Sequence, residues 1–302
     1  MTASPQRVLV TGLNGFTGVH LSHALAGAGY EVHGTIRADE APDDTHHVAD
    51  LADLDQLRKV ILQVRPIHVI HLAAVSFVGH GDVAEIYRTN IVGTSNLLKA
   101  LSTSKAAGIG LKTVLLASSA NIYGNTQVDP ITEDEPPKPA NDYAVSKAAM
   151  EQMAALWSES VPITMVRPFN YTGVGQSKQF LLPKIVDAFA RKAPVLELGN
   201  IDVERDFSDV RDVAAAYCGL LEASPRQVLN VCSGRAHSLR EILAFASDLS
   251  GHSPEIKINP DFVRGNEIRK LRGSAERLRL ALPGWSSRPV RETLKWMLDN
   301  GK

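Results

Sequence analysis

The sequence predicts an α/β fold, with a doubly wound parallel sheet followed by a smaller α/β region. Three observations predict this fold class. Short β-branched runs alternate with segments of helical spacing through the first half of the chain, a glycine-rich turn follows the first run, and the alternation loosens after residue 170. Strands that alternate with helices of this length form βαβ units, which give a parallel sheet covered by helices on both faces.

The predicted elements follow in chain order. The run "RVLVTG" (7–12) is apolar, β-branched and closed by glycine, as expected of a buried strand. The segment 53–66 has helical spacing and stops at Pro66. A glycine-rich loop at 171–180 and an irregular stretch at 251–266 belong to the looser C-terminal region. By the same criteria we predict further strands at 31–37, 67–74, 111–120 and 161–170, and further helices at 20–30, 84–104 and 143–160.

Composition limits the classes to which the protein can belong. The 302 residues are 44% hydrophobic, which suffices for a large core, and 32 basic residues nearly balance 33 acidic ones. No global field therefore draws the protein to nucleic acid or to an anionic membrane. The two cysteines, Cys218 and Cys232, cannot build a disulfide framework. There is no signal-peptide pattern and no apolar run of about 20 residues, so we expect a cytoplasmic protein with no membrane span.

Two local patterns have ordinary explanations. The "DDTHH" run (43–47) is interpreted as a loop, because adjacent histidines cannot easily share one ion, and we expect no metal site. The basic stretch 269–279 has no interleaved aromatic residues. It is typical of a solvated helix face, so no nucleic-acid partner is expected.

The glycine-rich turn predicts a dinucleotide site. "VTGLNGFTG" places Gly12, Gly15 and Gly18 between the first strand and the first helix. One glycine permits a tight turn, one lets the backbone approach a pyrophosphate, and one allows close helix packing. The turn thus identifies the sheet as Rossmann-type. We expect residues 1–168 and about 205–235 to form the cofactor-binding domain, and about 169–204 and 236–302 to form a smaller substrate-binding domain.

The end of the second predicted strand indicates which dinucleotide binds. A carboxylate there would bind the ribose hydroxyls of NAD and repel a 2′-phosphate. Residues 34–38 are "GTIRA", with Arg37 and no carboxylate before Asp39. This favours NADP(H), with NAD(H) possible. The alternative is that Arg37 is only a solvated charge at a strand end.

Several segments together resemble a known family. The glycine spacing, "HLAA" (71–74), Asn90 within a long predicted helix, "SSANIYG" (118–124) and "YAVSK" (143–147) are similar to the extended short-chain dehydrogenases/reductases of the NAD-dependent epimerase/dehydratase type. Members of that family modify nucleotide-activated sugars. The likeness continues through "RPFNYTGVGQ" (167–176) and covers nearly the whole chain. The later segments are most similar to the branch of GDP-mannose 4,6-dehydratases and GDP-4-keto-6-deoxymannose reductases, and within it to reductases that form GDP-D-rhamnose.

Three residues provide the groups that reduction of a ketone requires. Hydride transfer builds charge on the carbonyl oxygen, which needs a proton donor and a second donor to hold it. Tyr143 is the candidate acid and Ser119 the second donor. A phenol has a pKa of about 10 and needs a nearby cation, which Lys147 supplies one helical turn away. The resemblance implies that Lys147 also holds the nicotinamide ribose. The candidate cofactor-binding residues are Gly12, Asn14, Gly15, Phe16, Gly18, Arg37, Asp50, Leu51, Leu72, Ala73, Ala74, Tyr143 and Lys147.

The two residues after Ser119 separate the reactions of the family. A 4,6-dehydratase must move protons at C5 and C6 with carboxyl groups, and related dehydratases carry those acids in this segment. Here the residues are Ala120 and Asn121. The 3,5-epimerising relatives use a cysteine in this segment and a histidine in a later loop, where this chain has Asn121 and "GVGQS" (173–177). Reduction of a 4-keto group remains.

Substrate recognition is expected in the second half of the chain. A nucleoside diphosphate is anionic and is bound best by arginine forks and backbone amides. The resemblance and the residue types give Ser76, Asn121, Asn170, Arg205, Arg264 and Glu267 as candidate substrate-binding residues. A salt bridge from Arg205 to Asp206 or Asp209, and a solvated helix end at Glu267, stay open as simpler explanations of those two residues.

The sequence therefore favours an NAD(P)H-dependent reductase that converts GDP-4-keto-6-deoxy-D-mannose to GDP-D-rhamnose. A 4-epimerase needs little beyond the three catalytic residues, but such enzymes typically keep NAD tightly bound, which fits Arg37 poorly. A 4,6-dehydratase of the same family and a dinucleotide-sensing regulator without turnover also stay open. The resemblance further implies a homodimer formed by helices around 83–104 and 143–158. The nucleotide base and the configuration at C4 are left open.

Overall fold

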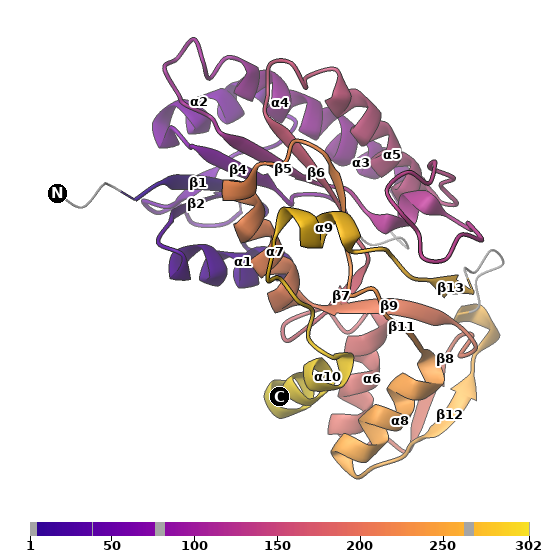
Figure 1. Ribbon diagram of the computed structural model, residues 1–302. Coiled ribbons are helices and arrows are strands. Elements are labelled where there is room, and N and C mark those ends of the chain that lie inside the picture. The colour runs from indigo at the N-terminus through magenta and orange to yellow at the C-terminus, as the bar shows by residue number, and fades with distance from the viewer. Residues whose placement is uncertain (1–4, 38, 76–81, 263–268, 302) are drawn as a thin grey trace.

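The protein is built around a seven-stranded parallel sheet (Figure 1). The computed structural model describes residues 5–37, 39–75, 82–262 and 269–301. The strand order β10-β6-β5-β4-β1-β2-β3, with every neighbouring pair parallel, confirms the predicted Rossmann-type sheet. Its strands are β1 (Arg7–Thr11), β2 (Glu31–Ile36), β3 (His46–Val48), β4 (His68–His71), β5 (Thr113–Ala117), β6 (Ile163–Pro168) and β10 (Val228–Val231).

Helices cover both faces of this sheet. Along β1, Val8 and Val10 pack in one apolar cluster with residues of α1 and α7, whereas Leu9 packs in another with residues of α2, α4 and α5. Successive strand residues point to opposite faces, so a continuous apolar run is needed when both faces are buried. The covering helices are α1 (Phe16–Gly27) and α7 (Val210–Ala223) on one face, and α2 (Leu54–Val64), α4 (Thr94–Ser102) and α5 (Asp142–Ala155) on the other (Figure 1).

The long helix expected at 84–104 is divided into three parts. α3 (Val83–Tyr87) passes into a π-helical segment, η1 (Arg88–Gly93), before α4 begins. The wider turn holds buried Asn90, whose side chain accepts a hydrogen bond from the Val75 amide at 3.0 Å and donates to Ser146 Oγ at 2.9 Å. π-helical turns within helices occur frequently at functional sites. This one connects the segment after β4 with the helix that carries Tyr143.

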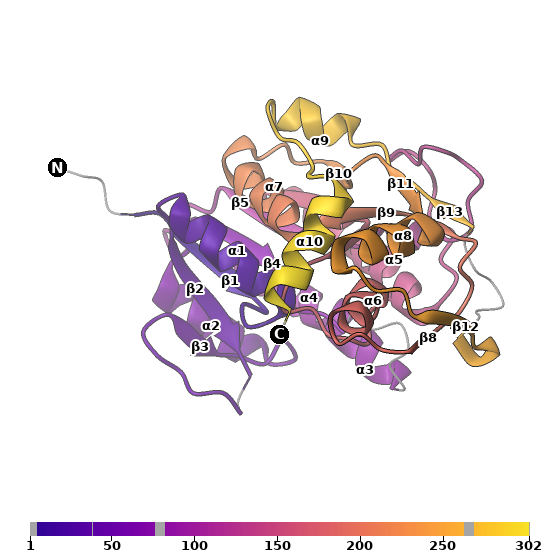
Figure 2. The ribbon, with the colours of Figure 1, turned by 90° about the horizontal axis from the view of Figure 1, so that it is seen from below.

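A second, smaller region follows β6 (Figure 2). Its central strand, β9 (Glu204–Asp209), pairs with β7 (Asn170–Thr172), β11 (Ala236–Ser238) and β13 (Lys270–Leu271), and β8 (Val195–Leu198) pairs with β12 (Glu255–Ile258). Three helices, α6 (Leu181–Ala190), α8 (Leu239–Ser250) and α10 (Val290–Asn300), share an apolar cluster there. The shorter elements are η2 (Ala120–Tyr123), η3 (Pro260–Phe262) and α9 (Glu276–Ala281).

Some local expectations need correction. The "DDTHH" run is not entirely a loop, because its two histidines begin β3 at the sheet edge, where buried His47 lies against His33 of β2. The first helix begins at Phe16 rather than at residue 20, and the stretches expected to be irregular contain β7, β12 and η3. Within the described ranges, no helix has both the length and the apolarity needed to cross a membrane.

Candidate active site

The turn between β1 and α1 accepts only glycine at two positions. Gly12 has φ +76°, and a Cβ added there would lie 2.9 Å from the backbone nitrogen of Ala73, at the end of β4. A Cβ at Gly18 would overlap the carbonyl oxygens of Leu13 and Gly12. Gly15 caps α1 without any side-chain hydrogen bond to its first amides. An uncapped helix N-terminus behind a tight glycine turn fits a pyrophosphate, so these residues could hold a dinucleotide.

The other candidate cofactor residues lie along the same edge of the sheet. Ala73 donates its amide to Thr11 Oγ1 at 3.3 Å, which ties the end of β4 to the end of β1. In a doubly wound sheet, ligands bind at the carboxyl ends of the strands. Leu72, Ala73 and Ala74 follow β4, and Arg37 follows β2. Asp50 and Leu51 come shortly after β3. The residues after β1 are Gly12, Asn14 and Gly15 in the turn and Phe16 and Gly18 in the first turn of α1.

Arg37 is exposed and lies between two carboxylates. Its Nε is 3.6 Å from Asp39 Oδ1 and 3.7 Å from Glu40 Oε1. Asn14 in the glycine turn also donates to Glu40. Arg37 and Asn14 thus share a carboxylate beside the glycine turn.

The catalytic candidates converge where β5 ends and α5 begins. Ser119 caps η2, and its Oγ accepts the Asn121 amide at 3.2 Å. Tyr143 lies in the first turn of α5, close enough to Ser119 for that hydroxyl to affect its pKa. Lys147, one turn further, donates to the carbonyl oxygen of Ala117 at 2.8 Å. The structure therefore brings Ser119, Tyr143 and Lys147 together in a buried group.

Burial sets the proton affinities of this group. It raises the pKa of Tyr143 to about 12, against the effect of the hydrogen bond with Ser119. It lowers the pKa of Lys147 to about 8, while the Glu151 carboxylate acts in the opposite direction. Burial, together with the Lys147 charge, lowers the pKa of His71 to about 3. At neutral pH the phenol is thus protonated and the ammonium charged beside a neutral imidazole.

These values predict the pH dependence of a reduction at this site. The pKa of Tyr143 is well above the working range, so the tyrosine stays protonated, whereas Lys147 loses its charge as the pH rises through about 8. A cation at Lys147 would stabilise a developing phenolate, so we expect kcat to fall above about pH 8. Steady-state rates measured from about pH 6 to about pH 10 test this, since that range lies on both sides of the lysine titration. In Lys147→Arg the charge persists at high pH, so the kcat of any residual activity should not fall above about pH 8. A pH profile identical to that of the native protein would contradict the assignment of this fall to Lys147.

Tyr171, Thr17 and His71 lie within segments quoted above but were not predicted as site residues. Tyr171 of β7 is hydrogen-bonded to Thr17 of α1 at 2.8 Å, and its ring stacks on Phe16 with centroids 6.1 Å apart. These contacts join the smaller region to the glycine turn. His71 links Thr11 Oγ1 of β1 at 2.6 Å with Thr94 Oγ1 of α4 at 2.9 Å.

The candidate substrate residues are described only in part. Asn170 and Arg205 lie on the paired strands β7 and β9, where Asn170 is opposite Phe207. Arg205 donates to the carbonyl oxygen of Glu204 at 2.9 Å.

The carboxylates that could have paired with Arg205 have other contacts. Asp206 accepts hydrogen bonds from Ser233 and Gly234, and Asp209 pairs with Arg211 at 2.6 Å. Asn121 is half-buried in η2. The remaining candidates, Ser76, Arg264 and Glu267, lie outside the described residues.

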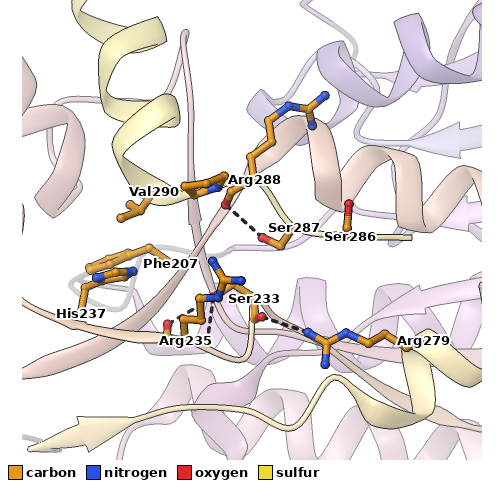
Figure 3. Close-up of a pocket in the computed structure, with 10 residues that line it drawn as sticks. Phe207, Ser233, Arg235, His237, Arg279, Ser286, Ser287, Arg288 and Val290 are labelled. Atoms are coloured by element: carbon orange, nitrogen blue, oxygen red, sulfur yellow. Dashed lines mark hydrogen bonds between the residues drawn. The ribbon is translucent and has the colours of Figure 1, made fainter. Parts of the chain in front are cut away.

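A cavity of about 90 Å³ lies apart from the catalytic group, between β9, β11, α9 and the start of α10 (Figure 3). Arg235, Arg279 and Ser233 line it, and Arg279 donates to the carbonyl oxygen of Ser233 at 3.4 Å. None of Ser119, Tyr143 and Lys147 is among its lining residues. A space of this size holds about three waters and is too small for a nucleotide.

The parallel sheet, the glycine turn and the Ser119, Tyr143 and Lys147 group define an extended short-chain dehydrogenase/reductase. Comparison with protein families identifies the particular branch. The family described as GDP-mannose 4,6 dehydratase matches residues 9–297. The chain therefore belongs to the GDP-mannose 4,6-dehydratase family, as the sequence motifs indicated.

Similar proteins cover the whole chain. A GDP-6-deoxy-D-mannose reductase from Pseudomonas aeruginosa is 36% identical over 98% of this chain and 97% of its own. A GDP-6-deoxy-D-talose 4-dehydrogenase from Aggregatibacter actinomycetemcomitans is 34% identical over 90% of each. Among solved structures, a candidate epimerase from Burkholderia cenocepacia is 48% identical, with a TM-score of 0.91 over 98% of both chains. The structure of RMD from Pseudomonas aeruginosa complexed with NADPH is 36% identical, with a TM-score of 0.84 over 98% of this chain and 97% of that one.

Proposed function

We propose that the protein reduces the 4-keto group of GDP-4-keto-6-deoxy-D-mannose with NADPH and forms GDP-D-rhamnose. The observation that carries the proposal is that Ser119, Tyr143 and Lys147 form a buried group. Ala120 and Asn121 follow Ser119 in the sequence, where a dehydratase needs acids. Relatives named for GDP-6-deoxyhexose chemistry, 34% and 36% identical over most of the chain, support the substrate class.

Each of the three residues has one task in this reaction. NADPH held at the glycine turn would supply the hydride for C4. Ser119 donates a hydrogen bond to the carbonyl oxygen and holds it near the phenol, and Tyr143 then transfers its proton to that oxygen. Lys147 stabilises the phenolate that remains. Burial of the group keeps water away and strengthens these interactions.

The same residues explain why dehydration is not favoured. Removal of a C5 proton and departure of the C6 hydroxyl require a base and an acid. Ala120 has no ionisable group and is 2% exposed, and the Asn121 amide does not titrate. The dehydratases of the family are also the more distant relatives, at 27% identity for a plant protein and 29% for a Vibrio protein.

The configuration at C4 distinguishes the activities for which the reductase and the talose dehydrogenase are named. Rhamnose and 6-deoxytalose differ only at C4, so hydride delivery to opposite faces of one 4-keto sugar gives one or the other. NMR spectra of the purified product distinguish them through the coupling between H3 and H4. We expect GDP-D-rhamnose, because the reductase is the relative with the broader coverage.

A nucleotide-sugar 4-epimerase is the second candidate, favoured by the description of the structure that is 48% identical. An epimerase oxidises and then reduces the same carbon, so it retains its dinucleotide through the cycle. Isolating the protein and measuring bound dinucleotide tests this directly. A stoichiometric amount of tightly held NAD, with epimerised UDP-sugar or GDP-sugar and no net oxidation of NADPH, would favour the epimerase.

Arg37 is proposed to bind the 2′-phosphate of NADPH, displacing the carboxylates it contacts here. We expect Arg37→Ala to raise KM for NADPH about tenfold, equivalent to about 1.4 kcal/mol, while KM for NADH changes little. Steady-state kinetics with both cofactors measure the difference. Arg58→Ala is the matched control, because Arg58 is an arginine on α2 paired with Asp55. Equal effects on both cofactors would contradict a 2′-phosphate contact.

The arrangement of domains and subunits is part of the same proposal. Residues 1–168 and about 205–235 would bind the cofactor, and about 169–204 and 236–302 the nucleotide sugar. A homodimer through α3, η1 and α5 is supported by exposed apolar side chains, namely Val83, Val92 and Val145 in these helices and Leu156 directly after α5. Light scattering of the purified protein tests the dimer. A cytoplasmic location remains the expectation.

A further inference from the structure

A buried ion pair lies directly behind the catalytic group. Arg167 of β6 binds Glu151 of α5 through both carboxylate oxygens, at 2.7 Å from Nη2 and 3.0 Å from Nε. The side chains are only 7% and 12% exposed. Even a well-paired buried ion pair often stabilises a fold no more than apolar residues of the same volume would, so fold stability alone is a weak reason for its presence.

The remaining donors of Arg167 are satisfied by the segment that follows Ser119. Its Nη1 donates to the Tyr123 hydroxyl at 2.9 Å and to the Glu133 carbonyl at 3.0 Å. The Tyr123 hydroxyl in turn donates to Asn230 of β10 at 2.7 Å. Tyr123 is fully buried at the end of η2, the short helix that Ser119 begins.

These contacts close a ring of restraints around the catalytic residues. From Ser119, η2 leads to Tyr123, and Arg167 connects Tyr123 to Glu151. From Glu151, α5 leads back through Lys147 to Tyr143, whose hydroxyl lies close to Ser119. Residues four apart on a helix lie on nearly the same face, so Glu151 fixes both the rotation and the axial position of the helix one turn beyond Lys147.

We propose that Glu151 and Arg167 are positioning residues for the reaction: the pair holds the helix that carries Tyr143 and Lys147 in register with the turn that carries Ser119. The role goes beyond geometry, because Glu151 is the carboxylate that acts on Lys147. The other groups near the lysine are Tyr143 on the same helix and neutral His71 from β4, with Arg167 from β6 behind Glu151.

The first test measures the lysine without any substrate. Lys147 is followed by NMR in protein labelled at lysine Cε, with its resonance assigned by Lys147→Arg. In Glu151→Gln we expect its titration midpoint to move to lower pH by about 0.5–1 unit, because an opposite charge favours the charged form. Glu255→Gln, an exposed carboxylate on β12, should leave the midpoint unchanged. An unchanged midpoint in Glu151→Gln would overturn the electrostatic part of the proposal.

The second test separates charge from position by kinetics, and it rests on the proposed reductase activity. Glu151→Asp keeps the charge but withdraws the carboxylate, so kcat should fall about tenfold with the KM values and the alkaline limit nearly unchanged. Glu151→Gln should lower kcat and also move the alkaline limit to lower pH. If native kcat is retained in both, Glu151 does not position the site. A protein with no reductase activity would refute the proposed function and leave the lysine titration as the deciding measurement.

A third variant, which is expected to stay folded, separates an effect on the site from a loss of folding. Tyr123→Phe removes one hydroxyl and no charge, so the fold should persist while η2 loses its hydrogen bond from Arg167 and keeps the packing of the ring against the guanidinium. We expect kcat to fall about threefold to tenfold, with the alkaline limit unchanged. A variant as active as the native protein would show that the ring of restraints does not matter for the reaction.

Discussion

Tyr143→Phe should lower kcat by about 10²–10⁴-fold, equivalent to about 3–5 kcal/mol of transition-state stabilisation. The substitution removes only the hydroxyl that lies close to Ser119 and leaves the buried ring in place. Cofactor binding should change far less than the rate, since Lys147 keeps its proposed contact to the nicotinamide ribose even though Tyr143 is also a candidate cofactor-binding residue. Stopped-flow oxidation of NADPH measures the rate, and quenching of protein fluorescence measures the affinity for NADPH.

The same variant separates an enzyme from a sensor of dinucleotides. A sensor would need binding alone, so Tyr143→Phe would keep its cellular function. An enzyme would lose that function together with the rate. Turnover in vitro by Tyr143→Phe at the native rate would show that another group donates the proton.

Gly18→Ala should abolish measurable binding of NADPH and lower the free energy of unfolding by about 1–3 kcal/mol. The added methyl group would overlap the carbonyl oxygens of Leu13 and Gly12. Both are backbone atoms of the turn that faces the pyrophosphate, so relief of the overlap must move the turn. Isothermal calorimetry with NADPH and denaturant unfolding measure the two effects.

Gly27→Ala is the matched control within the same helix. A Cβ at Gly27 meets no atom within 4 Å, and alanine is the better helix former by about 1 kcal/mol. This variant should bind NADPH normally and be slightly more stable. If Gly18→Ala and Gly27→Ala behaved alike, close packing at Gly18 would not explain the glycine.

The sheet and its cofactor edge were predictable because local patterns determine them. The apolar runs at β1 and β4 pack on both faces, and the requirement for glycine at positions 12 and 18 follows from close backbone contacts. The proximity of Tyr143 and Lys147 was predictable for a related reason. Tyr143 and Lys147 are one helical turn apart, so a short sequence motif contains their geometry.

Contacts between distant segments could not be predicted in the same way. Glu151 and Arg167 are 16 residues apart, and neither has a pattern that distinguishes a buried pair from two surface charges. Tyr171 and Thr17 are separated by 154 residues. The π-helical turn at Asn90 was not predicted either, because the sequence periodicity of a π-helix is nearly that of an α-helix. The tertiary contacts of the Asn90 side chain determine which of the two helix types forms.

The most direct measurement of the central claim is the reaction itself. Purified protein is mixed with GDP-4-keto-6-deoxy-D-mannose and NADPH, oxidation of NADPH is followed by absorbance, and the product is identified by NMR. Our account predicts one NADPH oxidised for each 4-keto sugar consumed, with GDP-D-rhamnose as the product. No oxidation of NADPH with this substrate, while the protein turns over a different 4-keto sugar nucleotide or epimerises a nucleotide sugar, would contradict it.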